Sequence, residues 1–174
     1  MNSIDFETLA AFRYQIRKFL RFSKDLLSSE DLTPDQYQAL LAIRVCSSRG
    51  KISVRELAEQ LQVRHHSTVG IVDQLVLRQA VVREVAPEDR RKTLLTLTEK
   101  GAEMIARLAP PHREELSRLS PEMIQTLQQL CPGRSAHPLD AAEEIRKQLF
   151  LSRDDTLEFP HMRPALGKVD LPQE

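Results

Sequence analysis

Hydrophobic residues in the first part of the chain recur every three or four positions, the spacing of one face of a helix. The repeating positions are Phe6, Leu9, Phe12, Ile16, Phe19, Leu20, Leu26 and Leu27. Four of the six phenylalanines lie in this segment, and Arg13, Arg17, Lys18, Arg21 and Lys24 are interleaved with them. Ordinary core is one interpretation. Because half of this apolar surface has no obvious partner in so short a chain, the pattern favours a helix shared with a second copy.

Two capping boxes predict the next helices. Thr33 and Gln36, with Pro34 between them, begin a helix that reaches about Cys46. Ser53 and Glu56 begin a shorter helix with an apolar stripe. About three residues, Gln62 to Arg64, separate it from another helical stretch whose apolar face is Val69, Val72, Leu75 and Val76. Two short helices joined by such a turn form a helix-turn-helix.

The pattern then changes from a helical period to alternation. Val81–Val85 and Thr93–Leu97 are predicted to be strands. The polar segment between them ends in three consecutive cations, Arg90, Arg91 and Lys92. The sequence therefore predicts a hairpin with a basic tip directly after the helix-turn-helix.

Helical signals return at Thr98, which caps a helix that Pro110-Pro111 is expected to kink or briefly interrupt before it resumes to about Leu119. Ser120-Pro121 is expected to begin a further helix that ends at Pro132-Gly133. Five of the ten prolines follow from Pro132 onward. One short helix is predicted there, from Asp140 to Phe150, and the last twenty or so residues are expected to be extended or disordered.

The composition limits the class of protein. With 174 residues, 41% hydrophobic and 29% charged, the chain can form one packed domain, or one domain plus an extension. Its 25 basic and 25 acidic residues balance, so any nucleic-acid binding must depend on a local patch. No apolar run approaches eighteen residues, and the first residues lack the basic and apolar regions of a signal peptide. We therefore expect a cytoplasmic protein without contact to a membrane.

A helix-turn-helix followed by a basic-tipped hairpin is the winged form of the motif. Its second helix can enter the major groove, while the hairpin reaches phosphates or the adjacent minor groove. Between Arg64 and Lys92 there are six Lys/Arg and four Asp/Glu, a modest basic excess. The predicted DNA contacts are Arg64, His65, His66, Ser67, Thr68 and Gln74 in the helix, and Arg90, Arg91 and Lys92 in the wing.

Five segments of this region carry a family resemblance: Leu57–Leu61, Arg64–Val69, Val72–Leu75, Pro87–Arg91 and Leu97–Gly101. Together they resemble the MarR family of bacterial transcriptional regulators. The Asp-x-Arg of the wing and the Leu-Thr-x-x-Gly after it are the most specific marks. The resemblance is strong over Thr33 to Gly101.

The resemblance implies a mainly α fold with a small β-hairpin wing, and a homodimer that reads a pseudo-palindromic operator on double-stranded DNA. Asp89 would pair with Arg91 and orient it toward the minor groove. Many family members are repressors released by a small aromatic or phenolic effector. The expected organisation is an N-terminal dimerisation helix (1–31), a DNA-binding lobe (32–101, wing 81–97), C-terminal dimerisation helices (102–131) and a Pro-rich extension (132–174).

Three positions depart from the family pattern. Gln79-Ala80 stands where the family often has Gly-Leu, so the turn into the wing can differ. Gly70 replaces a frequent basic residue of the recognition helix, which removes one expected contact. The stretch from Pro111 to Ser120 is about one helical turn shorter than usual.

Other functional classes fit the sequence less well. We expect no enzyme, since there is no phosphate loop, nucleophile elbow or catalytic dyad. Adjacent His65 and His66 lack further ligands, so no metal site and no cofactor are expected. Two alternatives stay open: a winged-helix module that binds an acidic protein partner, and an oxidant-sensing regulator using Cys46 or Cys131. A buried structural thiol is the favoured interpretation of each cysteine.

Overall fold

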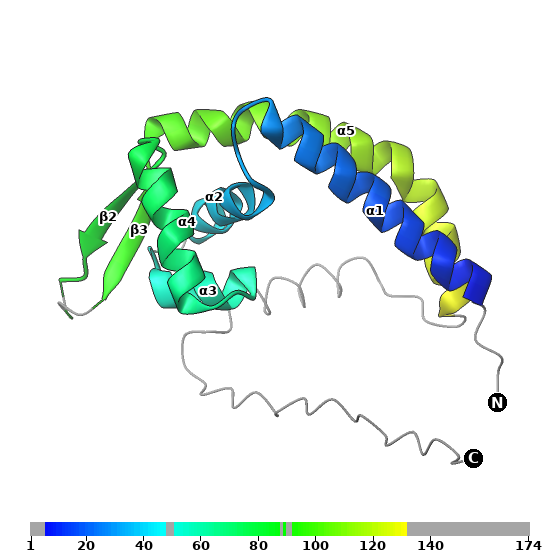
Figure 1. The fold of residues 1–174 in the computed structure, drawn as a ribbon, viewed down its shortest axis with the longest axis horizontal. Coiled ribbons are helices and arrows are strands. Elements are labelled where there is room, and N and C mark those ends of the chain that lie inside the picture. Colours follow the sequence, from blue (N-terminus) through cyan, green and yellow to red (C-terminus); the bar gives the residue numbers. More distant parts are fainter. Residues whose placement is uncertain (1–5, 48–50, 88, 90–91, 132–174) are drawn as a thin grey trace, which may run out of the picture.

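The computed structural model describes residues 6–47, 51–87, 89 and 92–131. In these ranges the elements are α1 (Phe6–Ser28), α2 (Pro34–Ser47), β1 (Ile52–Ser53), α3 (Val54–Leu61), α4 (His65–Leu77), β2 (Val81–Val85), β3 (Thr93–Leu97) and α5 (Glu99–Leu130). The predicted fold class, mainly α with a small β-hairpin wing, is confirmed (Figure 1). The predicted helix 140–150 and the extended tail lie outside the described residues.

Local capping fixes the beginnings of three helices, as predicted. At α2 the Thr33 amide donates to Gln36 Oε1 (2.9 Å) and the Gln36 amide donates to Thr33 Oγ1 (3.2 Å). At α3 the same reciprocal bonds join Ser53 and Glu56. At α5 the Gly101 amide donates to Thr98 Oγ1 (3.0 Å). Each bond satisfies an amide that the first turn of a helix otherwise leaves unpaired.

The three strands form one antiparallel sheet in the order β1-β3-β2. The hairpin register pairs Val81 with Leu97 at its base and Val85 with Thr93 near its tip. Strand β1, which pairs with β3 through Ile52 and Ser53, was not predicted, because two residues are too few to show an alternating pattern.

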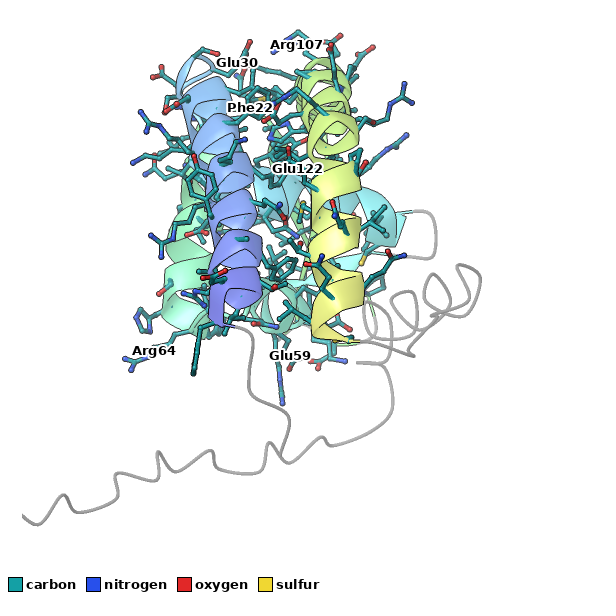
Figure 2. All side chains as sticks on the ribbon, turned by 90° about the vertical axis from the view of Figure 1, so that its right-hand side faces the viewer. Phe22, Glu30, Glu59, Arg64, Arg107 and Glu122 are labelled. Carbon is teal, nitrogen blue, oxygen red and sulfur yellow. The ribbon has the colours of Figure 1, made fainter. Side chains whose placement is uncertain are left out.

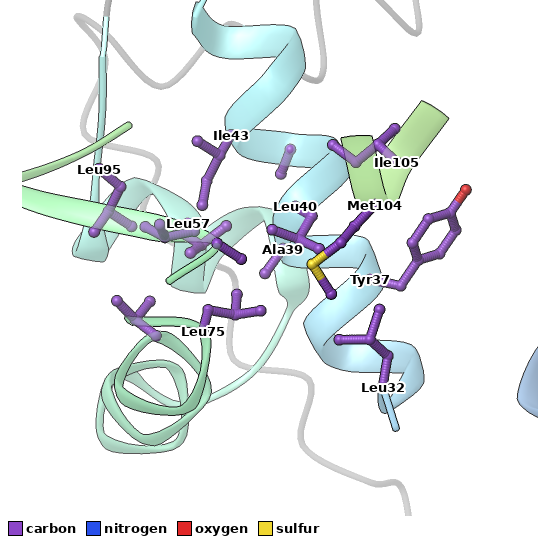
Figure 3. Packing of buried hydrophobic residues seen from close by; sticks show 14 of the residues in the cluster. Leu32, Tyr37, Ala39, Leu40, Ile43, Leu57, Leu75, Leu95, Met104 and Ile105 are labelled. Atoms are coloured by element: carbon purple, nitrogen blue, oxygen red, sulfur yellow. The ribbon is translucent and has the colours of Figure 1, made fainter. Parts of the chain in front are cut away.

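The hydrophobic core lies around α2 (Figure 3). Ala39, Leu40 and Ile43 of this helix are fully buried. They pack with large apolar side chains from α3, α4, β3 and α5, which are Leu57, Leu75, Leu95, Met104 and Ile105. Because burial of one Leu or Ile stabilises the fold by about 1.5–3 kcal/mol, this cluster holds α3, α4 and the wing as one lobe.

The C-terminal helical region is one helix of 32 residues, α5, rather than several. The predictions of a brief interruption at Pro110-Pro111 and of a new helix at Ser120-Pro121 were therefore wrong, while the alternative of a kink at Pro110-Pro111 stays a prediction. Pro121 cannot donate to the Ser117 carbonyl, but Ser120 Oγ donates to that carbonyl instead (3.0 Å). Figure 1 shows that α5 bends along its length without breaking.

Helix α1 packs antiparallel along the C-terminal part of α5 and forms an arm that extends from the lobe (Figures 1 and 2). Three contacts establish the direction, since increasing residue numbers along α1 and the turn after it meet decreasing residue numbers along α5. Thr126 Oγ1 donates to Gln15 Oε1 (3.1 Å), Ser23 Oγ lies 2.9 Å from His112 Nε2, and Arg107 Nη2 donates to Glu30 Oε2 (3.1 Å).

Candidate nucleic-acid interface

Helix α4 buries one face in the lobe and leaves the opposite face open. Thr68, Val72 and Leu75 are fully buried. Exposed residues recur at the helical spacing on the outer side of the helix: His66, Gly70, Asp73 and Leu77. This outer face of α4 is therefore available to a partner.

Five of the six predicted contact residues of the helix-turn-helix are exposed: Arg64, His65, His66, Ser67 and Gln74. The prediction for Thr68 was wrong, because its side chain is fully buried and Thr68 Oγ1 bonds the Arg64 carbonyl (3.4 Å). Each residue turns by about 100° around an α-helix, so Thr68 faces the core although its neighbour Ser67 faces outward.

The wing contributes Lys92, which is exposed, and Asp89, which is half-buried. Backbone bonds close the hairpin: the Ala86 amide donates to the Lys92 carbonyl (3.0 Å), and the Lys92 amide donates to the Asp89 carbonyl (2.9 Å). Arg90 and Arg91 lie outside the described residues, and so does the predicted pairing of Arg91 with Asp89.

A salt bridge fastens the wing to α4. Arg83 Nη1 on β2 donates to Asp73 Oδ1 (2.6 Å), and Arg83 Nη2 donates to the Val69 carbonyl (3.4 Å). The bridge also neutralises an acidic side chain on the outer face of α4. The sequence shows both charges, but it does not predict that they pair. Arg83 and Asp73 are ten positions apart, on a strand and a helix, and no local pattern indicates that they meet.

The ends of β2 and β3 that lead into the wing tip lie at the same end of the molecule as the beginning of α4 (Figure 1). Strand β2 starts beside the C-terminal end of α4 and runs back along it, so the hairpin continues toward the N-terminal end of α4 (Figure 1). Figure 2 shows Arg64 projecting at the end opposite to Glu30 and Arg107. The exposed residues Arg64, His65, His66, Ser67 and Lys92 are thus gathered toward one end.

The turn from α4 into the wing uses a left-handed residue. Gln79 has φ 60°, its amide donates to the Val76 carbonyl (2.8 Å), and the Ala80 amide donates to the Leu75 carbonyl (2.9 Å). These bonds form a Schellman motif, in which the left-handed position favours glycine. The predicted difference at Gln79-Ala80 therefore concerns the residue type, while the turn itself is an ordinary helix end.

An aromatic cluster lies where α1, α2 and α5 meet. His112 is buried, stacks on Tyr37 (4.7 Å between ring centroids, 15°), and meets Phe19 and Phe22 edge-on. His112 Nδ1 lies 2.7 Å from the Leu108 carbonyl, which can only accept, so Nδ1 carries a hydrogen. In neutral His112, Nε2 then accepts from Ser23 Oγ (2.9 Å). Burial raises the pKa of the Tyr37 phenol.

The two cysteines lie in different surroundings. Cys46 is partly buried against the core, whereas Cys131 is exposed, so the favoured interpretation as a buried thiol is wrong for Cys131. Among the described residues, no cluster of His, Cys, Asp and Glu could hold a metal ion. No helix within those ranges is long and apolar enough to span a membrane.

Comparisons with known proteins agree on one family. The sequence model of the MarR family matches residues 30–92. The transcriptional repressor NicR of Pseudomonas putida is 36% identical over 51% of this chain and 54% of its own length. A Thauera aromatica protein assigned to transcriptional regulation of the hcr operon is 32% identical over 55% of this chain and 56% of its own length. The chain thus spans little more than half the length of these curated relatives.

The fold is also similar to that of a solved MarR structure. The crystal structure of apo MarR from E. coli superposes with a TM-score of 0.54 over 86% of this chain and 99% of that one, at 23% sequence identity. The winged helix-turn-helix of this chain is thus similar to that of the MarR family, whose sequence model matches residues 30–92.

Proposed function

We propose that this protein is a homodimeric, sequence-specific DNA-binding regulator that acts as a transcriptional repressor in the cytoplasm and has no enzymatic activity. The observation that carries the proposal is the common orientation of two elements. The N-terminal part of α4 exposes polar and basic side chains, and the ends of β2 and β3 that lead into the wing tip lie toward the same end. This arrangement suits one element for the major groove and the other for the adjacent minor groove.

Each side chain of the interface has a proposed role. Arg64, His65, His66, Ser67 and Gln74 contact base edges or phosphates from α4 and the turn before it. Arg90, Arg91 and Lys92 hold the wing to DNA, and Asp89 orients Arg91 toward the minor groove. Cations in a narrow minor groove gain from its concentrated negative potential. The bridge from Arg83 to Asp73 keeps the two elements in register.

The proposed dimer is formed by α1 and α5. Both helices expose large apolar side chains, which are Phe6, Leu9, Tyr14 and Leu20 on α1 and Leu116, Ile124 and Leu127 on α5. Phe6 and Tyr14 are 73% and 64% exposed, respectively. Apolar surface of this extent on neighbouring helices is typical of a subunit interface. A two-fold axis between the arms would present two α4 helices to a pseudo-palindromic operator.

A small aromatic or phenolic effector is proposed to release the repressor. The cluster of Phe19, Phe22, Tyr37 and His112 supports this proposal, because it joins the arm to the lobe. A ligand that repacked this junction would change the separation of the two lobes. The relative NicR is named a transcriptional repressor, which supports repression rather than activation.

The proposal is tested by incubating the purified protein with genomic fragments and sequencing the bound DNA, with Arg91→Ala as the control variant. We expect an inverted repeat whose half-sites lie about one helical turn apart. Affinity for that site should fall steeply with salt, because phosphate contacts release counterions. Arg91→Ala should weaken binding by roughly 1–3 kcal/mol. Recovery of no site above the control, or a salt-independent affinity, would instead favour a protein-interaction module.

A further inference from the structure

The described part of the chain contains two glycines, Gly70 in α4 and Gly101 in α5, and contacts within the chain explain only one of them. A Cβ at Gly101 would lie 2.1 Å from the Ala80 carbonyl oxygen, so the close backbone approach excludes any side chain. A Cβ at Gly70 would meet no atom within 4 Å. Apart from proline, glycine is the least favourable residue in a helix, so Gly70 weakens α4 without a compensating contact inside the protein.

Gly70 interrupts the outer face of α4 at its middle. It is the sixth of the thirteen residues of the helix. His66 precedes it by four positions, and Asp73 and Gln74 follow it by three and four, so these three side chains are its neighbours on the helix surface. All three are exposed. The row of outer side chains therefore has a gap where the helix backbone itself is open.

The wing holds the helix on both sides of this gap. Arg83 donates to the carbonyl of Val69, the residue before Gly70, and to the carboxylate of Asp73, three residues after it. The open backbone is thus part of a braced surface, which can approach a partner closely without rearranging.

We propose that Gly70 is a specificity-determining residue, at the point where α4 comes closest to the floor of the major groove and its bare Cα meets a base edge. This inference rests on the proposed function. A side chain at this position would occupy the open space between the backbone of α4 and the bases that His66 and Gln74 flank. The thymine methyl is the apolar group that base edges present in this groove, and it matches the chemistry of a bare Cα.

The test compares wild type with Gly70→Ala and Gly70→Leu on the site recovered by selection and on unrelated DNA of equal length. Alanine removes the helix penalty, so Gly70→Ala should raise Tm by about 2–4 °C. The same variant should bind the selected site roughly tenfold more weakly, a loss of the size that one unfavourable base-pair contact causes. Gly70→Leu should lose more, and neither variant should lose affinity for unrelated DNA.

Gln79→Gly is the matched control, because it also stabilises the end of α4 but leaves the outer face unchanged; its site affinity should equal that of wild type. A repeated selection with Gly70→Ala should lose the base preference at one position of each half-site. Unchanged affinity and preference in Gly70→Ala would overturn the inference, and so would an equal loss on both DNAs. If wild type itself recovers no site, the proposed function fails instead.

Discussion

The guanidinium of Arg83 on β2 lies 2.6 Å from a carboxylate oxygen of Asp73 on α4, and this pair joins the two elements proposed to bind DNA. Both side chains are partly exposed, so the pair stabilises the fold by less than about 1 kcal/mol. Its larger effect is on the interface, because it fixes the wing beside α4 and neutralises an acid that would otherwise repel phosphates.

Arg83→Ala should therefore weaken operator binding about tenfold while Tm changes little, as measured by fluorescence anisotropy and thermal unfolding. The double variant Asp73→Asn/Arg83→Ala removes the exposed acid together with its partner and should recover much of the affinity. If the double variant is as weak as Arg83→Ala, neutralisation of Asp73 is not the cause.

His112 is predicted to be a structural residue at the junction of arm and lobe. His112→Ala removes a buried ring that packs on three aromatic side chains, together with its contacts to Ser23 Oγ and the Leu108 carbonyl. We expect the free energy of unfolding to fall by about 2–4 kcal/mol in urea titrations. His66→Ala, at an exposed position of α4, should stay within about 0.5 kcal/mol of wild type. Equal effects of the two substitutions would contradict the assignment.

Tyr37 should make the protein sensitive to alkaline pH. Burial raises its pKa above 10.0, the ordinary value, so the folded state favours the neutral phenol. The contribution of the neutral Tyr37 phenol to the free energy of unfolding is fully present below pH 10.0. It is lost as the pH rises through the higher pKa of the folded state. Tyr37→Phe should remove this part of the loss of stability at alkaline pH, as measured by unfolding experiments at several pH values.

The chain offers a direct control for this prediction, since it has two tyrosines and no tryptophan. Tyr14 is 64% exposed, and Tyr14→Phe should leave the alkaline loss in place. An unchanged alkaline profile in Tyr37→Phe would show that another group causes the loss.

Gln79 occupies a left-handed position that favours glycine, with φ 60°. Gln79→Gly should raise the free energy of unfolding by about 0.5–1 kcal/mol, the relief of backbone strain less the added entropy of the unfolded chain. Gln74→Gly, in the regular part of α4, should lower it by a similar amount. Denaturant titrations that show the same sign for both substitutions would disprove the role of the backbone angle.

Two neighbours in α4 should respond differently to loss of their hydroxyl groups. Ser67 is exposed, so Ser67→Ala should weaken operator binding by about 1 kcal/mol. Thr68 is fully buried, so Thr68→Val should leave operator affinity unchanged. Titration of both variants with the same labelled site measures the difference, and an equal loss would contradict the orientation of α4.

Local signals in the sequence determined much of this fold. The capping boxes at Thr33 and Ser53 and the cap at Thr98 were predictable because each joins groups three residues apart. The strands of the wing followed from alternation, and five of the six predicted contacts in the helix-turn-helix are exposed. Thr68 is the exception, since a rotation of one residue separates the outer face of a helix from the core.

The tertiary structure decided what depends on partners distant in the chain. At Pro121 the continuity of α5 is supported by Ser120 Oγ, which donates to the carbonyl that the proline leaves unpaired, and by packing against α1, neither of which helix propensity measures. The brace from Arg83 to Asp73 requires β2 to lie along α4, and the aromatic surroundings of His112 require three helices to meet. Sequence periodicity shows which face of an element is apolar, but only the packed chain determines which element covers that face.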